Sequence, residues 1–408
     1  MSAPNAERDT RIDFIRGVFI LMMCVDHFGY LLSLIGTNAQ AKVYTYNSIG
    51  WSSGAEFFVF FSGYVIATVY SRTLAACGFW KTQLRSAHRA WELYVRNAFV
   101  WVLAVALMRG VFEGNAALMA ATQIDRASAY PDAGILAFMT LQYMPTYFEV
   151  LPMYMTLMLI APAYLWLHDR LKQGAIGVSA LVWIAVQVHP QLNFHTVSGS
   201  PWNFNPFAWQ FVFFLGMWFA KECPLITFDR SDRLRKAAWV IGVLALCTEV
   251  KLLDKSDVVL PFVGVVDIPG HAKPNVEPLR LAHFLLVIYL VGIVMPANDW
   301  VKKRWVTRGI AQVGTNSLDC FCFSILLGYA TAGWFSMSAR GTFEYFALVG
   351  VNAAGLVLSA FWFTWLKTSP WRPPSGGARD KPVPPSSSPD ATVAGAATWP
   401  ATQMADPR

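Results

Sequence analysis

An apolar run near the start of the chain contains two ionisable residues that could move a proton. Residues 16–30 read RGVFILMMCVDHFGY, with Asp26 and His27 in the second half. Histidine accepts and returns a proton near neutral pH, so His27 is a candidate general base. Adjacent residues on a helix point about 100° apart, so we do not expect Asp26 to pair directly with His27. Asp26 or Glu56 is the candidate group to orient the imidazole or take up its proton. The alternative is a structural hydrogen bond between helices.

Arg16 is predicted to share a helix face with His27. The two residues are eleven positions apart, which places them about 20° from alignment and roughly 16 Å apart along a helix axis. Asp13 falls on the same face, one turn before Arg16. A charge at the centre of a bilayer costs about 2.5–3.5 kcal/mol, so such groups usually face a cavity and have a function. If this run crosses a membrane, Arg16 lies near its inner rim and His27 near its middle.

The composition predicts a membrane protein with many helices. The chain has 408 residues, of which 55% are hydrophobic and 14% charged, whereas soluble proteins carry about 25% charged residues. The net charge of +7 is not arranged as a basic stripe with interleaved aromatics, so nucleic-acid binding is not expected. We predict an all-α polytopic protein. Its ten apolar spans are 12–36, 54–72, 91–109, 147–167, 174–190, 206–221, 237–253, 279–298, 309–335 and 343–367.

The basic residues predict the orientation of these spans. Most Lys and Arg residues fall in the N-terminal segment, the C-terminal segment and the even-numbered connections. The positive-inside rule therefore places both termini in the cytoplasm. The six cysteines fall in spans or predicted inner loops, so no disulfide framework is expected. Cys320 and Cys322 would point to different faces of a helix, and no metal site is expected.

Two segments outside the spans have distinct compositions. Residues 134–144, GILAFMTLQYM, are too short to cross a bilayer and too apolar for a free loop. They predict a short interfacial or re-entrant helix within 110–146. Residues 371–408 are rich in Pro, Ser, Gly and Ala, which predicts a disordered cytoplasmic tail. The membrane domain is thus expected to cover 1–370.

A second motif opens the second span. Residues 54–70 read GAEFFVFFSGYVIATVY, and Glu56 would lie at the outer end of this helix, at about the depth of His27. Ser62 and Gly63 would allow close helix packing. Packing alone does not explain a carboxylate at Glu56.

These two motifs together resemble the start of the OpgC family. RIDFIRGVFILMMCVDHFGY (11–30) is followed by AEFFVFFSGY (55–64), and the spacing of Arg16 and His27 matches the Arg, ten residues, His pattern of the wider acyltransferase-3 superfamily. Asp319 departs from the mostly apolar residue that the family pattern has there. The resemblance runs through roughly residues 8–330. Its later blocks are YFEVLPMYM (147–155), WNFNPFAWQFVFFLG (202–216), RLAHFLLV (280–287) and VGTNSLDCFCFSI (313–325).

The resemblance implies a multi-pass enzyme of the bacterial inner membrane that succinylates osmoregulated periplasmic glucans. An acyl-CoA would be the cytoplasmic donor, and no permanently bound cofactor is expected. His27 would act as general base on a glucan hydroxyl or would carry the acyl group briefly before handing it on. Arg16, Arg85 and Arg89 are the candidate donor-binding residues, because guanidinium groups hold phosphates. The alternative for these arginines is simple positive-inside topology.

Residues at the predicted outer helix ends would bind the acceptor, since aromatic faces beside amide groups suit a sugar ring. Interfacial aromatic belts are the competing explanation. Other open hypotheses are O-acetylation of a different surface polysaccharide, a sugar transporter or flippase, and a non-catalytic scaffold. The candidate acceptor-binding residues are Glu149, His195, Asn205, Trp209, Gln210, Arg280 and His283.

Overall fold

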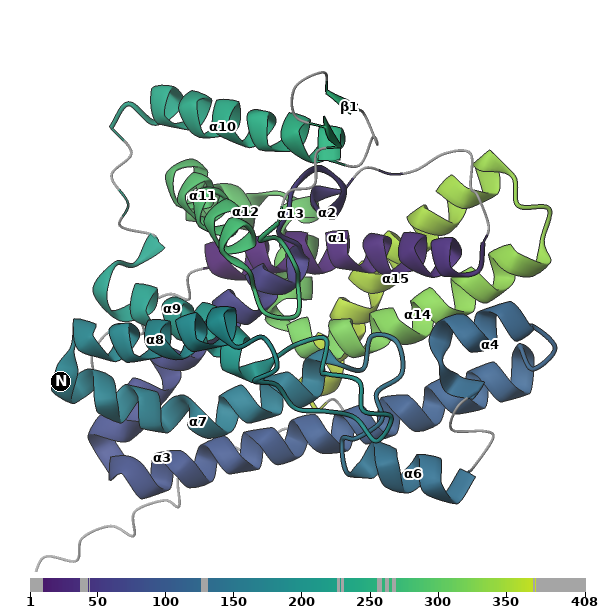
Figure 1. Ribbon diagram of the computed structural model, residues 1–408, viewed down its shortest axis with the longest axis horizontal. Helices are drawn as coiled ribbons and strands as arrows, with labels where there is room; N and C mark the ends of the chain where they lie inside the picture. The colour runs from purple at the N-terminus through teal and green to yellow at the C-terminus, as the bar shows by residue number, and fades with distance from the viewer. Residues whose placement is uncertain are drawn as a thin grey trace, which may run out of the picture. The chain divides into compact units, whose positions relative to one another are not determined.

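Apolar helices form nearly all of the regular structure in the computed structural model of the chain (Figure 1). The structure describes residues 10–36, 43, 45–125, 131–225, 228, 231–254, 259–260, 264–265, 269–369 and 371. The predicted tail therefore lies outside the described residues, except for Trp371. The elements are α1 (Arg11–Leu34), α2 (Tyr46–Ile49), α3 (Gly54–Val111), α4 (Ala116–Thr122), α6 (Pro131–Met139), α7 (Val150–Leu171), α8 (Gln173–Val188), α9 (Pro206–Glu222), α10 (Arg233–Asp254), β1 (Val259–Leu260), β2 (Gly264–Val265), α11 (Pro278–Val294), α12 (Asn298–Lys303), α13 (Trp305–Thr315), α14 (Ser317–Met337) and α15 (Thr342–Lys367).

The all-α prediction is confirmed, apart from the two-residue antiparallel strands β1 and β2. Every predicted span contains a helix, with two differences in how the helices are divided. The spans 54–72 and 91–109 both belong to α3, which turns at Gly78, where φ is 76°. The span 309–335 is divided at Asn316 into α13 and α14. Glycine adopts positive φ without strain, which explains the turn at Gly78.

Five helices of the described residues are long and apolar enough to cross a membrane: α1, α3, α7, α14 and α15. The apolar helices α8 and α11 are shorter. These helices make the chain a membrane protein, whereas the total of ten spans and the cytoplasmic termini stay predictions. The predicted short helix at 134–144 corresponds to α6, which begins earlier, and α4 is a second short helix within 110–146 that was not predicted.

α1 lies among α13, α14, α15 and α3, and the long α3 packs against α7 and α9 (Figure 1). The contact between α3 and α9 depends on Gly63, as the sequence predicted for this small residue. A Cβ atom at Gly63 would lie 2.0 Å from the Phe213 carbonyl oxygen of α9. The reciprocal Cβ at Gly216 would lie 2.0 Å from the Phe60 carbonyl oxygen. The backbones thus touch, and this fixes the helix that carries Glu56 and Ser62.

Candidate functional site

His27 is half-buried in α1, and its ring is held by an aromatic neighbour from the segment before α7. The imidazole stacks on the Tyr147 ring with centroids 3.9 Å apart, and the Tyr147 hydroxyl donates to the His27 carbonyl oxygen at 2.6 Å. The Nδ1 atom of His27 is buried and has no hydrogen-bond partner among the described residues. Tyr147 therefore orients the imidazole through its ring and the backbone, and leaves Nδ1 without a partner among the described residues. No pattern in the sequence indicated this role of Tyr147.

Asp26 does not contact His27 in the described part of the chain, as the predicted angle between neighbouring helical side chains requires. Its carboxylate accepts a hydrogen bond from the Thr45 hydroxyl instead. Thr45 immediately precedes α2, so Asp26 connects α1 to the segment that leads into α3.

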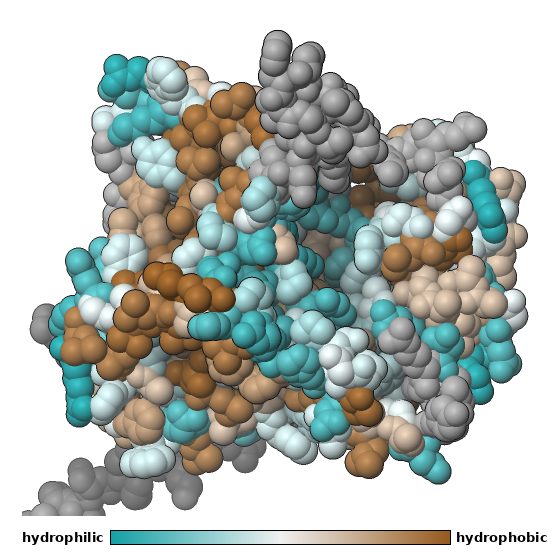
Figure 2. Space-filling model, viewed as in Figure 1, coloured by the Kyte–Doolittle hydropathy of each residue, from teal (hydrophilic) through white to brown (hydrophobic). Residues whose placement is uncertain are grey.

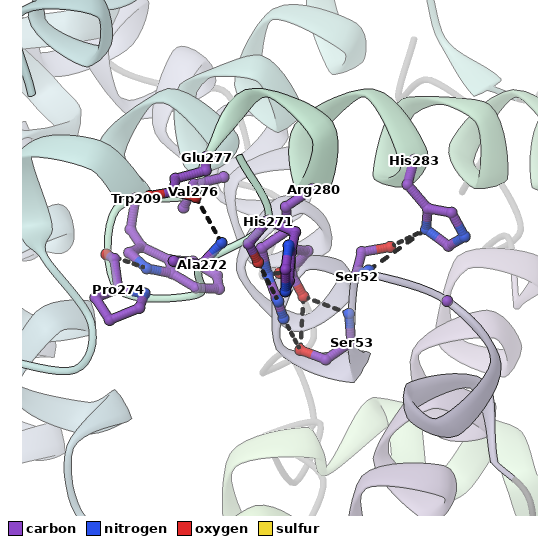
Figure 3. Close-up of polar contacts among 12 residues, drawn as sticks. Ser52, Ser53, Trp209, His271, Ala272, Pro274, Val276, Glu277, Arg280 and His283 are labelled. Atoms are coloured by element: carbon purple, nitrogen blue, oxygen red, sulfur yellow. Dashed lines mark hydrogen bonds and ion pairs between the residues drawn. The ribbon is translucent and has the colours of Figure 1, made fainter. Parts of the chain in front are cut away.

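Glu56 is fully buried and caps the start of α3. Its Oε2 accepts from the Ser53 amide at 2.8 Å and from the Ser53 hydroxyl at 2.7 Å, which is a capping box. Its Oε1 forms an ion pair with Nε of Arg280 from α11. Arg280 also donates to the Ser53 hydroxyl at 3.2 Å and to the His271 carbonyl oxygen at 3.3 Å (Figure 3). Both oxygens of Glu56 are therefore occupied by groups that join α3 to α11.

His283, one turn after Arg280, belongs to the same connection. Its Nδ1 lies 2.7 Å from the Ser52 hydroxyl (Figure 3). The same atom lies 3.2 Å from the Tyr46 hydroxyl. We call Ser52, Ser53, Glu56, Arg280 and His283 the anchored cluster. Burial raises the pKa of Tyr46, so this phenol stays protonated as a hydrogen-bond donor.

Three predicted acceptor-binding residues are buried and hold neighbouring segments. Asn205 caps α9 and donates to the Leu192 carbonyl oxygen at 2.8 Å. The Trp209 indole donates to the Pro274 carbonyl oxygen at 3.2 Å, and Gln210 bonds to Ser179 of α8. The Trp209 bond holds the loop 271–277, which precedes α11, and so does a hydrogen bond of 2.8 Å from the Asn205 side chain to the Asn275 side-chain oxygen.

The two remaining acceptor candidates are more accessible. His195 is exposed in a loop, where it forms an isolated bridge with Pro201. Glu149 is half-buried and accepts a hydrogen bond from the exposed Asn203 amide at 2.5 Å. The face viewed in Figure 2 has a hollow near its middle, with hydrophilic residues around it. Because Glu149 is half-buried and Asn203 exposed, these two residues are better placed than the buried Asn205, Trp209 or Gln210 to meet a sugar.

Lys273 is a half-buried cation that the sequence analysis did not single out. Its Nζ lies 4.5 Å from the centre of the Phe204 ring. Burial and the nearby Arg280 charge lower the pKa of Lys273, while Glu56, Glu149 and Asp26 act in the opposite direction. One signal was available, because a lysine in a predicted outer loop is unusual in a chain whose cations gather on the other side.

The three predicted donor-binding residues line one cavity of about 790 Å³. Arg16 enters it from α1 and donates to the Ser317 hydroxyl at the start of α14, while Arg85 and Arg89 enter from the second arm of α3. We call this space the cationic cavity, because three further cations line it, with Glu92 and Asp319 as its acids. The three additional cations are Lys81, Arg96 and Lys367.

Asp319, which departs from the family pattern, has two partners in this cavity. It forms ion pairs with Arg96 of α3 and with Nζ of Lys367 at 2.8 Å. Lys367 also donates to the Asn316 side-chain oxygen at 2.6 Å. The acid thus joins α14 to α3 and α15 at the rim of the cavity.

A layer of aromatic rings lies between the cationic cavity and His27. Tyr154 lines the cavity, and its ring centre is 5.9 Å from that of Phe58. Phe58 lies 5.7 Å from Phe321, whose ring is in turn 6.2 Å from the His27 ring. His27 itself does not line the cavity. Ring contacts thus connect the wall of the cavity with the imidazole.

The helices and the site define a class: a membrane protein with a histidine inside its helix bundle and a cation-lined cavity reaching toward it. The comparison with known families gives the particular group. The family described as OpgC protein matches residues 8–368, so the chain belongs to the OpgC family. Membership indicates a transferase that modifies glucans with acyl groups. No curated protein matches this chain.

Proposed function

We propose that this protein transfers a succinyl group from a cytoplasmic acyl-CoA to a hydroxyl group of a periplasmic glucan. The observation that supports this function best is the position of His27. Its ring is half-buried and oriented by Tyr147, and it shares α1 with Arg16, which lines the cationic cavity. A proton acceptor and an anion-binding cavity thus lie along one helix.

The reaction needs one proton acceptor and no redox step. His27 takes the proton from a glucan hydroxyl as the hydroxyl oxygen attacks the thioester carbonyl carbon. A new ester C–O bond forms, the C–S bond breaks, and the thiolate leaves. The imidazolium returns the proton to that thiolate, which leaves as the free thiol of coenzyme A. General-base assistance of this kind typically contributes about 10²–10⁴-fold to the rate.

The cationic cavity is the proposed donor site. Coenzyme A carries several phosphate charges, and arginine binds phosphate oxygens through paired N–H groups. Arg85 is exposed and Arg89 half-buried on one wall, and Arg16 lies on α1 at the side nearer the histidine. In this arrangement the phosphates stay among the arginines while the thioester passes the aromatic layer toward His27.

The acceptor site is proposed around Glu149 and Asn203. A carboxylate oxygen and an amide can accept and donate hydrogen bonds to sugar hydroxyls. Tyr30 is exposed and its ring lies 6.4 Å from Tyr147, so an aromatic face is available near His27. The anchored cluster gives this region its shape, and Glu56 acts there as a positioning residue through α3.

Mass spectrometry of periplasmic glucans tests the function. Cells that carry the wild-type protein should yield glucans with a mass increase of one succinyl group per substituent. His27→Ala should abolish that increase, with the protein still present in the membrane at its normal level. His189→Ala is the matched control, because His189 is exposed at the end of α8 and outside the proposed site.

The same measurement separates the proposal from its alternatives. Increments of one acetyl group would assign a different donor to the same site. Normal succinylation in the His27→Ala cells would reject His27 as the base. Unmodified glucans from every strain would reject the acyltransferase function for this protein.

A further inference from the structure

The loop 271–277 is built into the protein by hydrogen bonds from buried residues. Figure 3 shows the Trp209 indole donating to the Pro274 carbonyl and Glu277 accepting from the Ala272 amide at 2.8 Å. The Trp183 indole donates to the Val276 carbonyl oxygen at 2.9 Å. These contacts involve residues before and after Lys273 in the chain, so the backbone that carries this lysine has a fixed position.

The ammonium group of Lys273 is a cation without a counter-ion in direct contact. It has no hydrogen-bond or ion-pair partner among the residues that the structure describes, and it lies over the Phe204 ring. Arg280, by contrast, forms an ion pair with Glu56 and donates a hydrogen bond to the Ser53 hydroxyl. Lys251 donates to the carbonyl oxygens of residues 47 and 50. Lys273 can therefore bind an anion without first breaking an ion pair.

Lys273 lies near the proposed acceptor site, because its ammonium group lies over the ring of Phe204, which follows Asn203 in the chain, and Asn203 donates to Glu149. The charge of Lys273 acts on Asp26, Glu56 and Glu149, and also on His27. Each of the three carboxylates has a donor of its own. Thr45 bonds to Asp26, Arg280 to Glu56 and Asn203 to Glu149. The acids support the charged form of Lys273 from a distance, without occupying its N–H groups.

We propose that Lys273 binds the free carboxylate of the transferred acyl group and thereby selects a succinyl donor over an acetyl donor. This inference rests on the proposed function and adds the residue that sets its specificity. A succinyl group differs from an acetyl group by a carboxylate at its far end, two methylene groups from the reacting carbonyl. An acetyl group has no carboxylate for Lys273 to bind.

Physical reasons favour such selection at this position. A hydrogen bond between an ammonium and a carboxylate is stronger than one between neutral groups, and partial burial strengthens it further. The Phe204 ring supports the cation from one side and the anchored loop limits its movement. Direct contact favours the acyl carboxylate, since no ion pair joins Lys273 to Asp26, Glu56 or Glu149 in the part of the chain that the structure describes.

The test compares two donors on the full-length protein in detergent micelles. Succinyl-CoA and acetyl-CoA are supplied separately, with unsubstituted periplasmic glucans as acceptor, and kcat/KM is measured for each donor. Lys273→Met should lower kcat/KM for succinyl-CoA by about 10- to 100-fold, the range of a hydrogen bond to a charged group. The value for acetyl-CoA should stay close to that of the wild type. Lys273→Arg keeps the charge and should retain most of the succinyl preference.

Arg340→Gln is the matched control for removing a cation. Arg340 is exposed in the connection after α14 and donates to the Ser336 carbonyl oxygen near the end of that helix, so both donors should react as with the wild type. Equal losses with both donors in Lys273→Met would overturn the proposal, since a structural or general catalytic role predicts that result. No change with either donor would overturn it too. A wild-type protein that transfers acetyl but not succinyl groups would reject Lys273 as selector yet leave acyl transfer standing, whereas transfer of neither group would reject the proposed function itself.

Discussion

Arg280 and Glu56 of the anchored cluster are buried and bonded to each other, whereas Arg85 and Lys81 of the cationic cavity are exposed to open space. A buried pair with satisfied hydrogen bonds has little freedom left to bind a ligand. Exposed cations around a cavity can exchange water for phosphate. The charges of the first region therefore maintain structure, and those of the second are available for binding.

The largest effect should come from breaking the buried pair. Arg280→Met leaves the Glu56 carboxylate buried without its cation, and such a loss typically costs about 3–5 kcal/mol of stability. We expect a large drop in melting temperature in detergent and little protein in the membrane. The double variant Glu56→Gln, Arg280→Met should recover part of that loss. Wild-type melting of the single variant would contradict the structural role of this pair.

Substitutions in the cationic cavity should change donor binding and leave stability nearly unchanged. Arg85→Met and Arg89→Met should leave the melting temperature nearly unchanged, because Arg85 is exposed and the pair of Arg89 with Glu92 lies at the surface. Each should raise the KM for the acyl-CoA donor by about 10- to 100-fold through loss of a charged hydrogen bond. Arg109→Met on the same helix is the control, since Arg109 is outside the cavity. An unchanged donor KM in both variants would argue against a phosphate-binding role.

The difference between the anchored cluster and the cationic cavity also shows which features the sequence could predict. Hydropathy located a helix in every expected span, because each apolar run carries its own signal. To predict that Arg16, Arg85 and Arg89 lie together, it was enough that the first three predicted spans place them on the same side of the membrane. The two corrections to the spans, at Gly78 and Asn316, depend on single residues inside otherwise continuous helical patterns.

The region around His27 was harder to predict, because its contacts join distant parts of the chain. Asn205, Trp209 and Gln210 read as sugar-binding residues, yet their partners come from the loop 271–277 and from α8. No local pattern shows which loop folds back onto which helix. The same holds for Tyr147, which resembles an ordinary interfacial aromatic until the structure places it on His27.

Tyr147 offers a smaller test, within the site itself. Tyr147→Phe keeps the stacked ring and removes the hydrogen bond to the His27 carbonyl oxygen. A neutral hydrogen bond contributes about 0.5–1.5 kcal/mol, so kcat should fall by roughly 2- to 10-fold. The KM for the donor should not change, because Tyr147 is not among the residues that line the cationic cavity. Tyr289→Phe on α11 is the control, and a rise in donor KM without a fall in kcat would contradict the role assigned to Tyr147.

The smallest effect is expected at Asp319. This residue combines features of the two regions, because it is ion-paired like the anchored cluster but lies in the cationic cavity. The side chains of Arg96 and Lys367 are 37% and 55% exposed, so solvent screens both pairs. Asp319→Asn should therefore change stability by no more than about 1 kcal/mol. The variant removes a negative charge from the cationic cavity, so donor binding should tighten by less than about tenfold, mostly at low salt. Weaker donor binding at every salt concentration would mean that Asp319 positions Arg96 and Lys367 for the phosphates, and the cavity would then depend on fixed pairs as the anchored cluster does.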